Sequence, residues 1–500
     1  MNRDVELRFA QAQWDQLYNH LYPGDGWEHA AVVLASLVER PGQTPRLLVR
    51  EVLLAQDGVD YGVSPQGHGR LAATFINRAI IRARNERLVY LHVHNHGSDR
   101  SVEFSDVDFA SHERGYPALL DIAKGMPVGA LVFGQRSLQI DMWWSKTERA
   151  KLKRCTVVSS RIQRLYSSPA HIAKTAYRPS VDRQVRFLGE AGQAQLAGAR
   201  IAIIGLGGVG SMVVQDMARL GVGELLLIDS DKLEETNLSR VVTAIFRDVA
   251  CKPPKTDLAA RYARQVNPQV RCEVIEDDVA YDDVADKLVD CDFIFLCADT
   301  MRARLVVNAI VNQHLIPAVQ IGSKVLLAEG TGKLEQFYSV VRHLRPGCGC
   351  MLCNGLISGS RLAIEEKTDE DWRAQNYGTE TPNPSVITLN GIGASRATHD
   401  FLMDFVGTDV GRPTAGYYMY DVFKGTWLKT NPRHDKDCTE CSADTESRFA
   451  RGAAVHLPCR ERSKKPQTVQ ARIVSFIRNI WSTLMRSAAS TATSTTRQRF

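Results

Sequence analysis

A glycine-rich turn between two apolar segments constrains this chain more than any other feature. The run ARIAIIGLGGVG is followed by the helical pattern SMVVQDMARL and by a second apolar run that ends at Asp229. Strand, glycine turn, helix and strand in this order predict a βαβ unit of a parallel sheet. Glycines let the backbone approach a phosphate at a helix N-terminus, and Asp229 is placed to accept from ribose hydroxyls. The pattern predicts a nucleotide site, with either NAD or ATP, at Gly205, Gly207, Gly208, Gly210 and Asp229.

The residues after the second strand favour ATP. Asp231, Asn237 and Arg240 follow within a dozen positions, and Lys255 comes next in the segment KPPK. Arg240 and Lys255 add positive charge to that of the helix dipole. This larger positive charge suits the phosphates of a triphosphate better than those of a pyrophosphate. The strand DFIFLCAD ends at Asp299, and a carboxylate at that sheet edge suits Mg²⁺ on the phosphates.

A second group of polar residues follows the apolar run LVYLHV. His94 and His96 come where that strand ends, and Ser105 and Asp108 follow three apart. Two imidazoles and one carboxylate on tetrahedral zinc leave the fourth position to water, the arrangement of a catalytic site. His92 is a competing ligand, because it lies two residues before His94.

The cysteines predict a second metal site. Two C-x-x-C pairs, Cys350 with Cys353 and Cys438 with Cys441, are spaced as in a closed tetrahedral zinc site of structural type. Cys348 offers a third sulfur beside the first pair, and four thiols without metal are the alternative. Cys272, Cys291 and Cys297 lie in apolar contexts and are expected in the core.

Composition bounds the class of protein. With 500 residues, 44% apolar and 24% charged, the chain is expected to fold as two or three globular units. The chain has 62 basic and 56 acidic residues, and 11 of the basic but only one of the acidic residues lie after position 447. The excess positive charge is therefore confined to the C-terminal part of the sequence, which excludes a general nucleic-acid-binding role. No apolar run is long enough for a membrane span, and the few, uneven cysteines predict a reducing cytoplasm.

The pattern shifts predict an α/β chain with four regions. The first mixes short apolar strands with a helix, the second is a proline-containing linker, and the third begins before the glycine turn. The fourth is basic, with an amphipathic stretch from Ile473 to Met485 and a Ser/Thr-rich end. We expect these regions at residues 1–155, 156–180, 181–445 and 446–500.

The histidine motif resembles that of the JAMM/MPN metallopeptidases, His-x-His, seven residues, Ser-x-x-Asp, with one extra residue before Ser105. That family also needs a glutamate on an early strand, and Glu28 occupies that place, with Glu51 as a competitor. The resemblance implies an α/β domain in which His94, His96 and Asp108 bind zinc. Glu28 would move the proton of the bound water and Ser105 would help to stabilise the oxyanion.

The third region resembles the ThiF/MoeB and ubiquitin-activating adenylation domains. Their motifs read here DSDKLEETNLSR, CKPPK and DTMRAR, and the arginine-glutamine pair before the glycine turn is Arg183-Gln184. The family's pattern departs at Val241 and Thr300, where it has Gln and Asn. The resemblance implies a Rossmann-like doubly wound sheet, ATP-binding Arg304, a zinc knuckle, and a homodimer in which Arg183 reaches the neighbouring ATP site.

Thioester-forming relatives keep a cysteine in the connection after the first knuckle, and this connection has none between Cys353 and Cys438. Cys251 and Cys459 are the alternatives. The two resemblances therefore imply a bifunctional enzyme that adenylates the terminal glycine of a ubiquitin-like protein and cleaves its precursors or conjugates, with a conjugating enzyme as a further partner. Activation of a sulfur carrier for thiocarboxylate formation and a non-catalytic binding scaffold are the alternatives.

Overall fold

The computed structural model describes residues 3–62, 70–169, 179–328, 331–365, 384–407, 415–443, 446–460 and 462. Met1–Cys459 forms one compact unit and Arg460–Phe500 a second. The amphipathic stretch expected from Ile473 to Met485 lies outside the described residues. Among the described residues, no helix is both long and apolar enough to cross a membrane.

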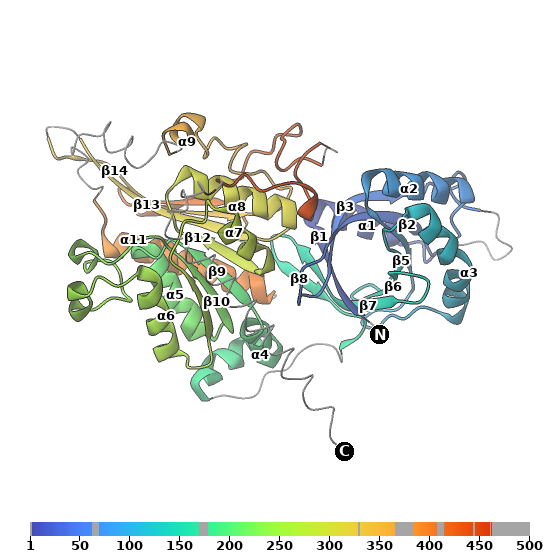
Figure 1. The fold of residues 1–500 in the computed structure, drawn as a ribbon, viewed down its shortest axis with the longest axis horizontal. Coiled ribbons are helices and arrows are strands. Elements are labelled where there is room, and N and C mark those ends of the chain that lie inside the picture. Colours follow the sequence, from blue (N-terminus) through green and yellow to red (C-terminus); the bar gives the residue numbers. More distant parts are fainter. Residues whose placement is uncertain are drawn as a thin grey trace, which may run out of the picture. The chain divides into compact units, whose positions relative to one another are not determined.

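The N-terminal part of the first unit is built on a mixed sheet that closes on itself (Figure 1). The strands lie in the order β1-β3-β2-β4-β5-β6-β7-β8, and β1 also pairs with β7 in parallel. Their bounds are β1 Arg3–Ala10, β2 Ala30–Val38, β3 Arg46–Leu54, β4 Val89–Asn95, β5 Val128–Phe133, β6 Leu138–Trp143, β7 Arg149–Val158 and β8 Ile162–Leu165.

Three helices cover this sheet. α1 (Gln11–Leu21) packs on one face, where alternate residues of β1 and β2 form a core. α2 (Ala73–Glu86) and α3 (Asp106–Ala123) pack on the other face. β2 is almost wholly buried because both of its faces are covered. The expected α/β composition of this part is confirmed.

The second sheet combines parallel and antiparallel strands in the order β11-β10-β9-β12-β13-β14-β15-β16. β11, β10, β9, β12 and β13 run parallel, and β13 to β16 run antiparallel. Their bounds are β9 Arg200–Ile204, β10 Glu224–Ile228, β11 Arg271–Ile275, β12 Phe293–Leu296, β13 Ala318–Leu327, β14 Leu334–Leu344, β15 Tyr417–Asp421 and β16 Thr426–Thr430.

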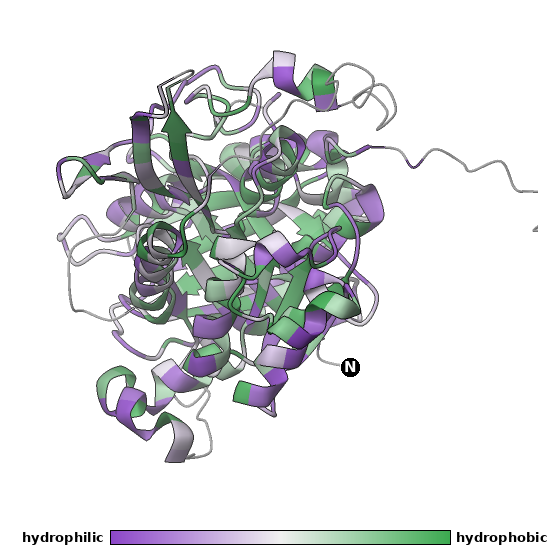
Figure 2. Ribbon diagram, turned by 90° about the vertical axis from the view of Figure 1, so that its left-hand side faces the viewer, coloured by the Kyte–Doolittle hydropathy of each residue, from purple (hydrophilic) through white to green (hydrophobic). Residues whose placement is uncertain are grey.

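Helices lie on both faces of this sheet, so the Rossmann-like doubly wound arrangement is confirmed. One face carries α4 (Asp182–Ala197), α5 (Gly208–Leu220), α6 (Lys255–Val266) and α11 (Ile387–Val406). The other carries α7 (Asp282–Ala285) and α8 (Met301–His314). Apolar residues concentrate in the strands and in the helix faces that touch them (Figure 2).

The shorter helices lie in the connections. The α-helical one is α9 (Gly359–Glu365). The 3₁₀ turns are η2 Pro179–Val181, η3 Glu235–Asn237, η4 Phe246–Ala250, η5 Asp286–Asp290 and η6 Gly452–Ala454.

The two folded regions extend beyond two of the domain boundaries expected from the sequence, those at residues 155 and 445. β8 carries the first sheet to Leu165, inside the stretch expected as a linker. Phe449 and Ala450, in the stretch expected as a tail, are buried in the core of the second sheet. That core also contains Val38 and Leu48 of the first sheet, so apolar side chains pack continuously between the two sheets.

Candidate functional site

The glycine turn lies at the edge of the second sheet where its parallel strands end. β9 has β10 on one side and β12 on the other, so the chain connections diverge beside β9, and sheets of this kind bind ligands in a crevice at such a point. Gly205 has a φ of +85°, and a Cβ at this position would lie 2.6 Å from the backbone nitrogen of Ala298. The loops after β9 and β12 therefore meet in a way that only glycine permits.

The other turn glycines form the start of α5. Gly207 precedes the helix and has open space where a side chain would project, whereas a Cβ on Gly210 would lie 1.8 Å from the carbonyl oxygen of Gly205. Gly208 faces the amide of Asn390 on α11. Open space beside free backbone N–H groups at a helix N-terminus suits a phosphate. Asn390, which is buried, was not among the residues expected here.

Asp229 holds the glycine turn in place. Its carboxylate accepts from the backbone N–H of Leu206 at 2.5 Å and of Asp231 at 2.8 Å. Burial raises the pKa of Asp229, and the bond from Leu206 opposes that rise. Asp231 in turn pairs with Lys255, whose Nζ lies 2.7 Å from its carboxylate. The structure thus brings Asp229, Asp231 and Lys255 together at the glycine turn.

The remaining expected residues of this site are distributed around the same edge. Asn237 is buried at the end of η3, and its side chain accepts from the N–H of the N-cap residue Glu234 at 3.3 Å. The Arg240 guanidinium donates to the carbonyl of Thr236 at 2.8 Å. Asp299 is exposed just before α8, and its charge acts on Arg304 in the first turn of that helix. The pKa of Arg304 is lowered, mainly by burial. Arg183 is exposed on α4.

The expected histidine and aspartate ligands converge at the end of β4. The Nε2 atoms of His94 and His96 lie 3.2 Å apart, and the Asp108 carboxylate lies 3.5 Å from the first and 3.6 Å from the second. Ligand atoms on tetrahedral zinc, with bonds of about 2.0–2.1 Å, lie roughly 3.3 Å apart. The three side chains therefore fit a zinc ion, and among the described residues His92 is outside this group.

Ser105 places Asp108 on α3. The serine is the N-cap, and its hydroxyl donates to the Asp108 carboxylate at 2.7 Å while accepting from the Asp108 N–H at 3.2 Å. Burial raises the pKa of Asp108, but hydrogen bonds from His94 and Ser105 outweigh it and hold that pKa well below its usual range. The extra residue before Ser105 is accommodated in the loop after His96, because the side chains of the three expected ligands still meet.

Glu28 is exposed immediately before β2, and its charge acts on His96. Asn95 is buried between His94 and His96 in sequence, and its side chain forms hydrogen bonds with the backbone on both sides of Glu28. Its side chain accepts from the N–H of His29 at 2.6 Å and donates to the carbonyl of Trp27 at 3.3 Å. Asn95 was not among the expected residues, although its place between the two expected ligands was a usable signal. Glu51 instead pairs with Arg82 at 2.8 Å.

The four cysteines of the two C-x-x-C pairs form a closed, buried cluster. Sulfur atoms lie 3.6 Å apart between Cys350 and Cys353, 3.7 Å between Cys350 and Cys438, and 3.6 Å between Cys353 and Cys441. Tetrahedral zinc with Zn–S bonds of about 2.3 Å requires roughly 3.8 Å. The cluster therefore fits a zinc ion, and Cys348 is exposed outside it.

The other cysteines are placed in two ways. Cys291 is buried, and Cys272 and Cys297 pack against the core, as expected. Cys251 is exposed at the end of η4, and Cys459 is half-buried against the core of the second sheet.

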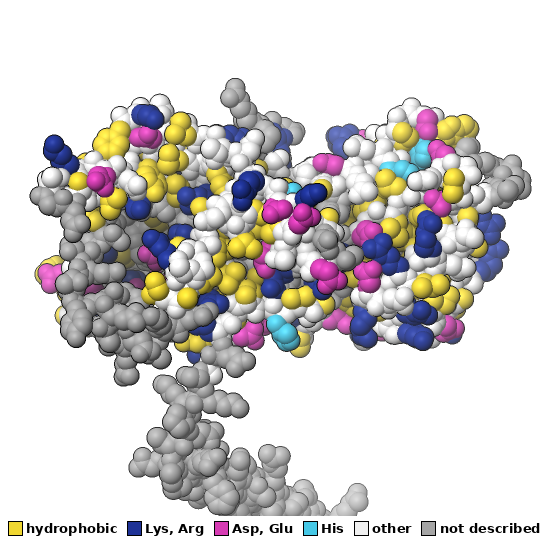
Figure 3. All heavy atoms as spheres, turned by 90° about the horizontal axis from the view of Figure 1, so that it is seen from above, with side chains coloured by type: hydrophobic (Ala, Val, Ile, Leu, Met, Phe, Trp, Pro, Cys, Tyr) yellow, Lys and Arg dark blue, Asp and Glu magenta, His cyan; other side chains and the backbone are white. Residues whose placement is uncertain are grey.

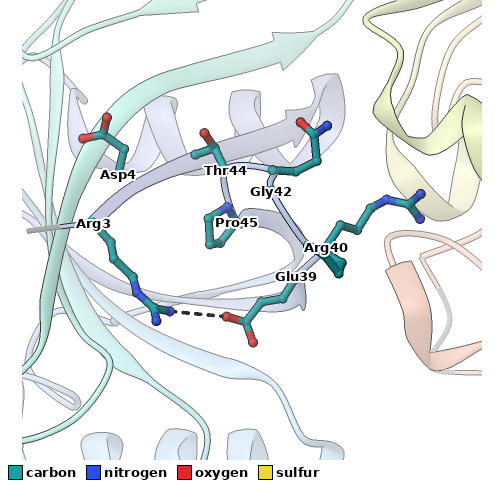
Figure 4. Close-up of a pocket in the computed structure, with 9 residues that line it drawn as sticks. Arg3, Asp4, Glu39, Arg40, Gly42, Thr44 and Pro45 are labelled. Atoms are coloured by element: carbon teal, nitrogen blue, oxygen red, sulfur yellow. Dashed lines mark ion pairs between the residues drawn. The ribbon is translucent and has the colours of Figure 1, made fainter. Parts of the chain in front are cut away.

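A cavity of about 700 Å³ lies away from all of these residues. It is lined by Arg3, Asp4 and residues 39–45, and Arg3 pairs across it with Glu39 at 3.8 Å (Figure 4). None of the expected site residues lines it. On the face shown in Figure 3, basic and acidic side chains are interspersed.

Comparison with known proteins identifies the second sheet. The family model described as "ThiF family" matches residues 181–447, which is more than half of the chain. The expected ThiF/MoeB relationship is therefore confirmed for this part.

Three curated relatives show the breadth of the similarity. The SAMP-activating enzyme E1 of Haloferax volcanii is 33% identical over 33% of this chain and 57% of its own length. The tRNA threonylcarbamoyladenosine dehydratase of Escherichia coli is 32% identical over 30% of this chain and 56% of its own length. The ubiquitin-like modifier-activating enzyme 5 of Drosophila persimilis is 26% identical over 48% of this chain and 61% of its own length. The chain spans less than two thirds of the length of these relatives.

Among solved structures, E. coli MccB with ATP aligns with a TM-score of 0.42 and 20% identity, over 53% of this chain and 75% of MccB.

Proposed function

Since this chain belongs to the ThiF family, we propose that its second sheet is an E1-like adenylyltransferase that uses ATP. The observation that carries the proposal is the meeting of the loops after β9 and β12 beside the N-terminus of α5. Gly207 leaves space for phosphates there, and Lys255 and Asp299 lie at the same sheet edge. This combination supplies phosphate-binding N–H groups, a cation and a carboxylate suited to Mg²⁺.

In the proposed reaction, a carboxylate oxygen of the substrate attacks the α-phosphorus of ATP. A bond between that oxygen and phosphorus forms, the bond to the bridging oxygen breaks, and pyrophosphate leaves. Arg240 and Lys255, with Arg183 of a second copy, would stabilise the charge that develops on the phosphoryl oxygens. Mg²⁺ held by Asp299 would orient the pyrophosphate. The homodimer that this role of Arg183 requires is part of the proposal.

We propose a ubiquitin-like or sulfur-carrier protein as the substrate. Two of the relatives are named for activating such modifiers, the SAMP-activating enzyme and the ubiquitin-like modifier-activating enzyme. An extended C-terminal tail can reach a phosphate in a crevice, which a folded surface cannot. The missing cysteine after the first knuckle favours transfer as a thiocarboxylate slightly over transfer through a thioester.

A second function is favoured by the convergence of His94, His96 and Asp108. We propose that residues 1–155 are a JAMM-type zinc peptidase or isopeptidase that cleaves precursors or conjugates of the same carrier. Zinc bound there would acidify a water molecule. Glu28 would take the proton of that water and pass it to the leaving amine, and Asn95 would hold Glu28 in position.

The four-cysteine cluster completes the proposal as a structural zinc site of the adenylation region at residues 181–445. A conjugating enzyme is proposed as a further partner, and the few, unevenly placed cysteines favour a cytoplasmic location. A scaffold whose two sites recruit carriers without chemistry remains the alternative of a different class.

ATP–pyrophosphate exchange that depends on a carrier protein tests the main proposal. Asp299→Ala is expected to abolish exchange, because the metal-bound polyphosphate loses its carboxylate, while cleavage of a carrier fusion continues. Glu28→Ala is the matched control, with exchange intact and cleavage lost. Unchanged exchange in a folded Asp299→Ala protein would refute the site, and absence of both activities in the wild type would support the scaffold.

A further inference from the structure

The helix α3 carries Asp108 at an end that is mostly exposed. Every residue of α3 is described, and only His112, Tyr116 and Ala123 are buried. None of them lies in the first turn, where the N-cap Ser105 is exposed and Asp108 is partly exposed. His112 follows Asp108 by four positions, so the two side chains project from the same side of the helix. His112 is therefore the first side chain that the ligand-bearing end of α3 buries.

Asp141 of β6 receives the His112 imidazole. The Nδ1 atom of His112 lies 2.8 Å from a carboxylate oxygen of Asp141, and both side chains are buried. An ionised carboxylate only accepts hydrogen bonds, so Nδ1 carries the hydrogen and donates it. Two further donors hold the same carboxylate, the indole of Trp143 at 3.2 Å and the guanidinium of Arg149 at 2.5 and 3.0 Å. Asp141 is thus a fixed point of the sheet to which α3 is attached.

Strand register places this attachment on the face that carries an expected zinc ligand. Asp141 lies opposite Ala130 of β5, and Ala130 lies opposite His92 of β4. Residues paired in this way project to the same face of a sheet, and so does His94, two residues after His92. α3 packs on this face (Figure 1). The bond from His112 therefore joins α3 to the sheet two strands away from the strand of His94.

Aromatic contacts limit the directions that the His112 ring can take. The Phe104 ring neighbours two imidazoles, with its centroid 6.1 Å from that of His94 and 5.1 Å from that of His112. Its contact with His112 is edge-to-face, and the Tyr116 ring stacks on His112 at 4.6 Å. Such arrangements are the favoured geometries of ring pairs. The His112 ring is therefore held in the orientation that its hydrogen bond requires.

We propose that His112, held by Asp141, is a positioning residue that fixes α3 so that Asp108 meets the two histidine ligands. The proposal deepens the zinc peptidase function proposed above and rests on it. Ser105 orients the Asp108 carboxylate relative to α3, whereas the bond from His112 fixes α3 relative to the sheet. Neither member of the pair is expected to touch substrate, so the pair acts through Asp108.

The origin of the three expected ligands explains why this attachment matters. Two of them stand at the end of β4 and one on α3, so a small rotation of α3 withdraws the carboxylate and leaves two imidazoles. Groups that support a metal ligand usually change metal affinity or activity by about 10- to 100-fold. We expect the effect in metal binding itself, and in cleavage only as its consequence.

The experiment measures Co²⁺ binding to the full chain, with Co²⁺ in place of zinc because its absorption spectrum depends on the number and geometry of its ligands. The His94→Ala protein is the blank that accounts for metal on the cysteines. His112→Leu should weaken Co²⁺ binding at the histidine cluster by about 10- to 100-fold and change the spectrum. His112→Asn places an amide N–H donor near the position of Nδ1 and should recover most of both.

Two controls separate positioning from stability. Tyr116→Phe keeps a ring at the same place on α3 and removes only the hydroxyl. Leu17→Ala weakens the core on the opposite face of the sheet, where α1 packs, and leaves α3 untouched. Both variants should bind Co²⁺ as wild type does, although Leu17→Ala should unfold at a lower temperature. Thermal unfolding compares the stability of all the variants.

Wild-type affinity and spectrum in His112→Leu would overturn the proposal. So would an equal loss in Leu17→Ala, which would assign the effect to stability, or no recovery in His112→Asn, which would assign it to ring packing. Affinity that depends on His112 in a protein that cleaves no carrier fusion would support the positioning role and refute the peptidase. If wild type binds no Co²⁺ at the histidine cluster, the zinc site and the positioning role are both refuted.

Discussion

The two clusters that fit a metal differ in nearly every respect that matters for reactivity. The cysteine cluster has four ligands, all buried, from two chain segments that are far apart in sequence. The cluster of His94, His96 and Asp108 has three, two of them partly exposed, and an exposed glutamate stands beside it. A complete, closed ligand set leaves no position for water, whereas an incomplete one beside a base does. The closed cluster is therefore the one proposed to hold the fold, and the open cluster the one proposed to perform chemistry.

The largest effect is expected from removing a ligand of the closed cluster. Cys441→Ala should release the zinc there and lower the free energy of unfolding by several kcal/mol, because metal binding and folding are coupled at such sites. Metal analysis and thermal unfolding measure both effects. Cys348→Ser, outside the cluster, is the matched control and should change neither. Full stability without that zinc would show that the cluster is not a structural site.

His94→Ala removes an expected ligand from the open cluster and leaves the cysteine cluster intact. The zinc of the open cluster should be lost and cleavage abolished, while the cysteine-bound zinc and ATP–pyrophosphate exchange are retained. Unfolding should become easier by only about 1–2 kcal/mol, the usual range for one substitution. Metal analysis that shows equal zinc in wild type and this variant would refute the ligand assignment.

Glu28→Ala tests which group moves the proton. Zinc should remain in both clusters, since Glu28 is not expected to be a ligand, but cleavage of a carrier fusion should fall by about 10²- to 10⁴-fold. The measurements are the cleavage rate and the zinc content of the same preparation. A variant that loses zinc together with activity would make Glu28 a ligand instead.

The smallest effect is expected at Asn95. Asn95→Ala removes both hydrogen bonds that hold the backbone around Glu28, so the glutamate should be less well placed. Loss of such a supporting contact usually costs about 10- to 100-fold. Cleavage should fall less than in Glu28→Ala, with zinc retained. An unchanged kcat would show that the hydrogen bonds of Asn95 have no part in positioning Glu28.

What could be predicted from sequence was set by short-range spacing. The glycine turn and the His-x-His and Ser-x-x-Asp motifs each lie within one strand end or one helix start, so local rules place their side chains. The two C-x-x-C pairs are far apart, but their identical spacing indicated a shared site. The structure places Gly205 in the turn after β9 and brings the side chains of His94, His96 and Asp108 together.

What could not be predicted depends on contacts between distant segments. The pairing of β1 with β7 joins Leu7 to Cys155, and no periodicity in the sequence encodes that partner choice. The neighbours His92, Ala130 and Asp141 follow from strand register, which one sequence does not reveal. The burial of Phe449 was missed because the basic residues around it resemble a solvated tail.

The position of Phe449 has a practical consequence for experiments that test the two proposed activities separately. Its carbonyl accepts from Arg50 of β3, while its ring lies in a core with residues of α8. A fragment cut between the sheets would lose this bridge and expose apolar surface on both sides of the cut, which favours aggregation. Single substitutions in the intact chain, rather than truncated fragments, are therefore the sound way to assign each activity to its residues.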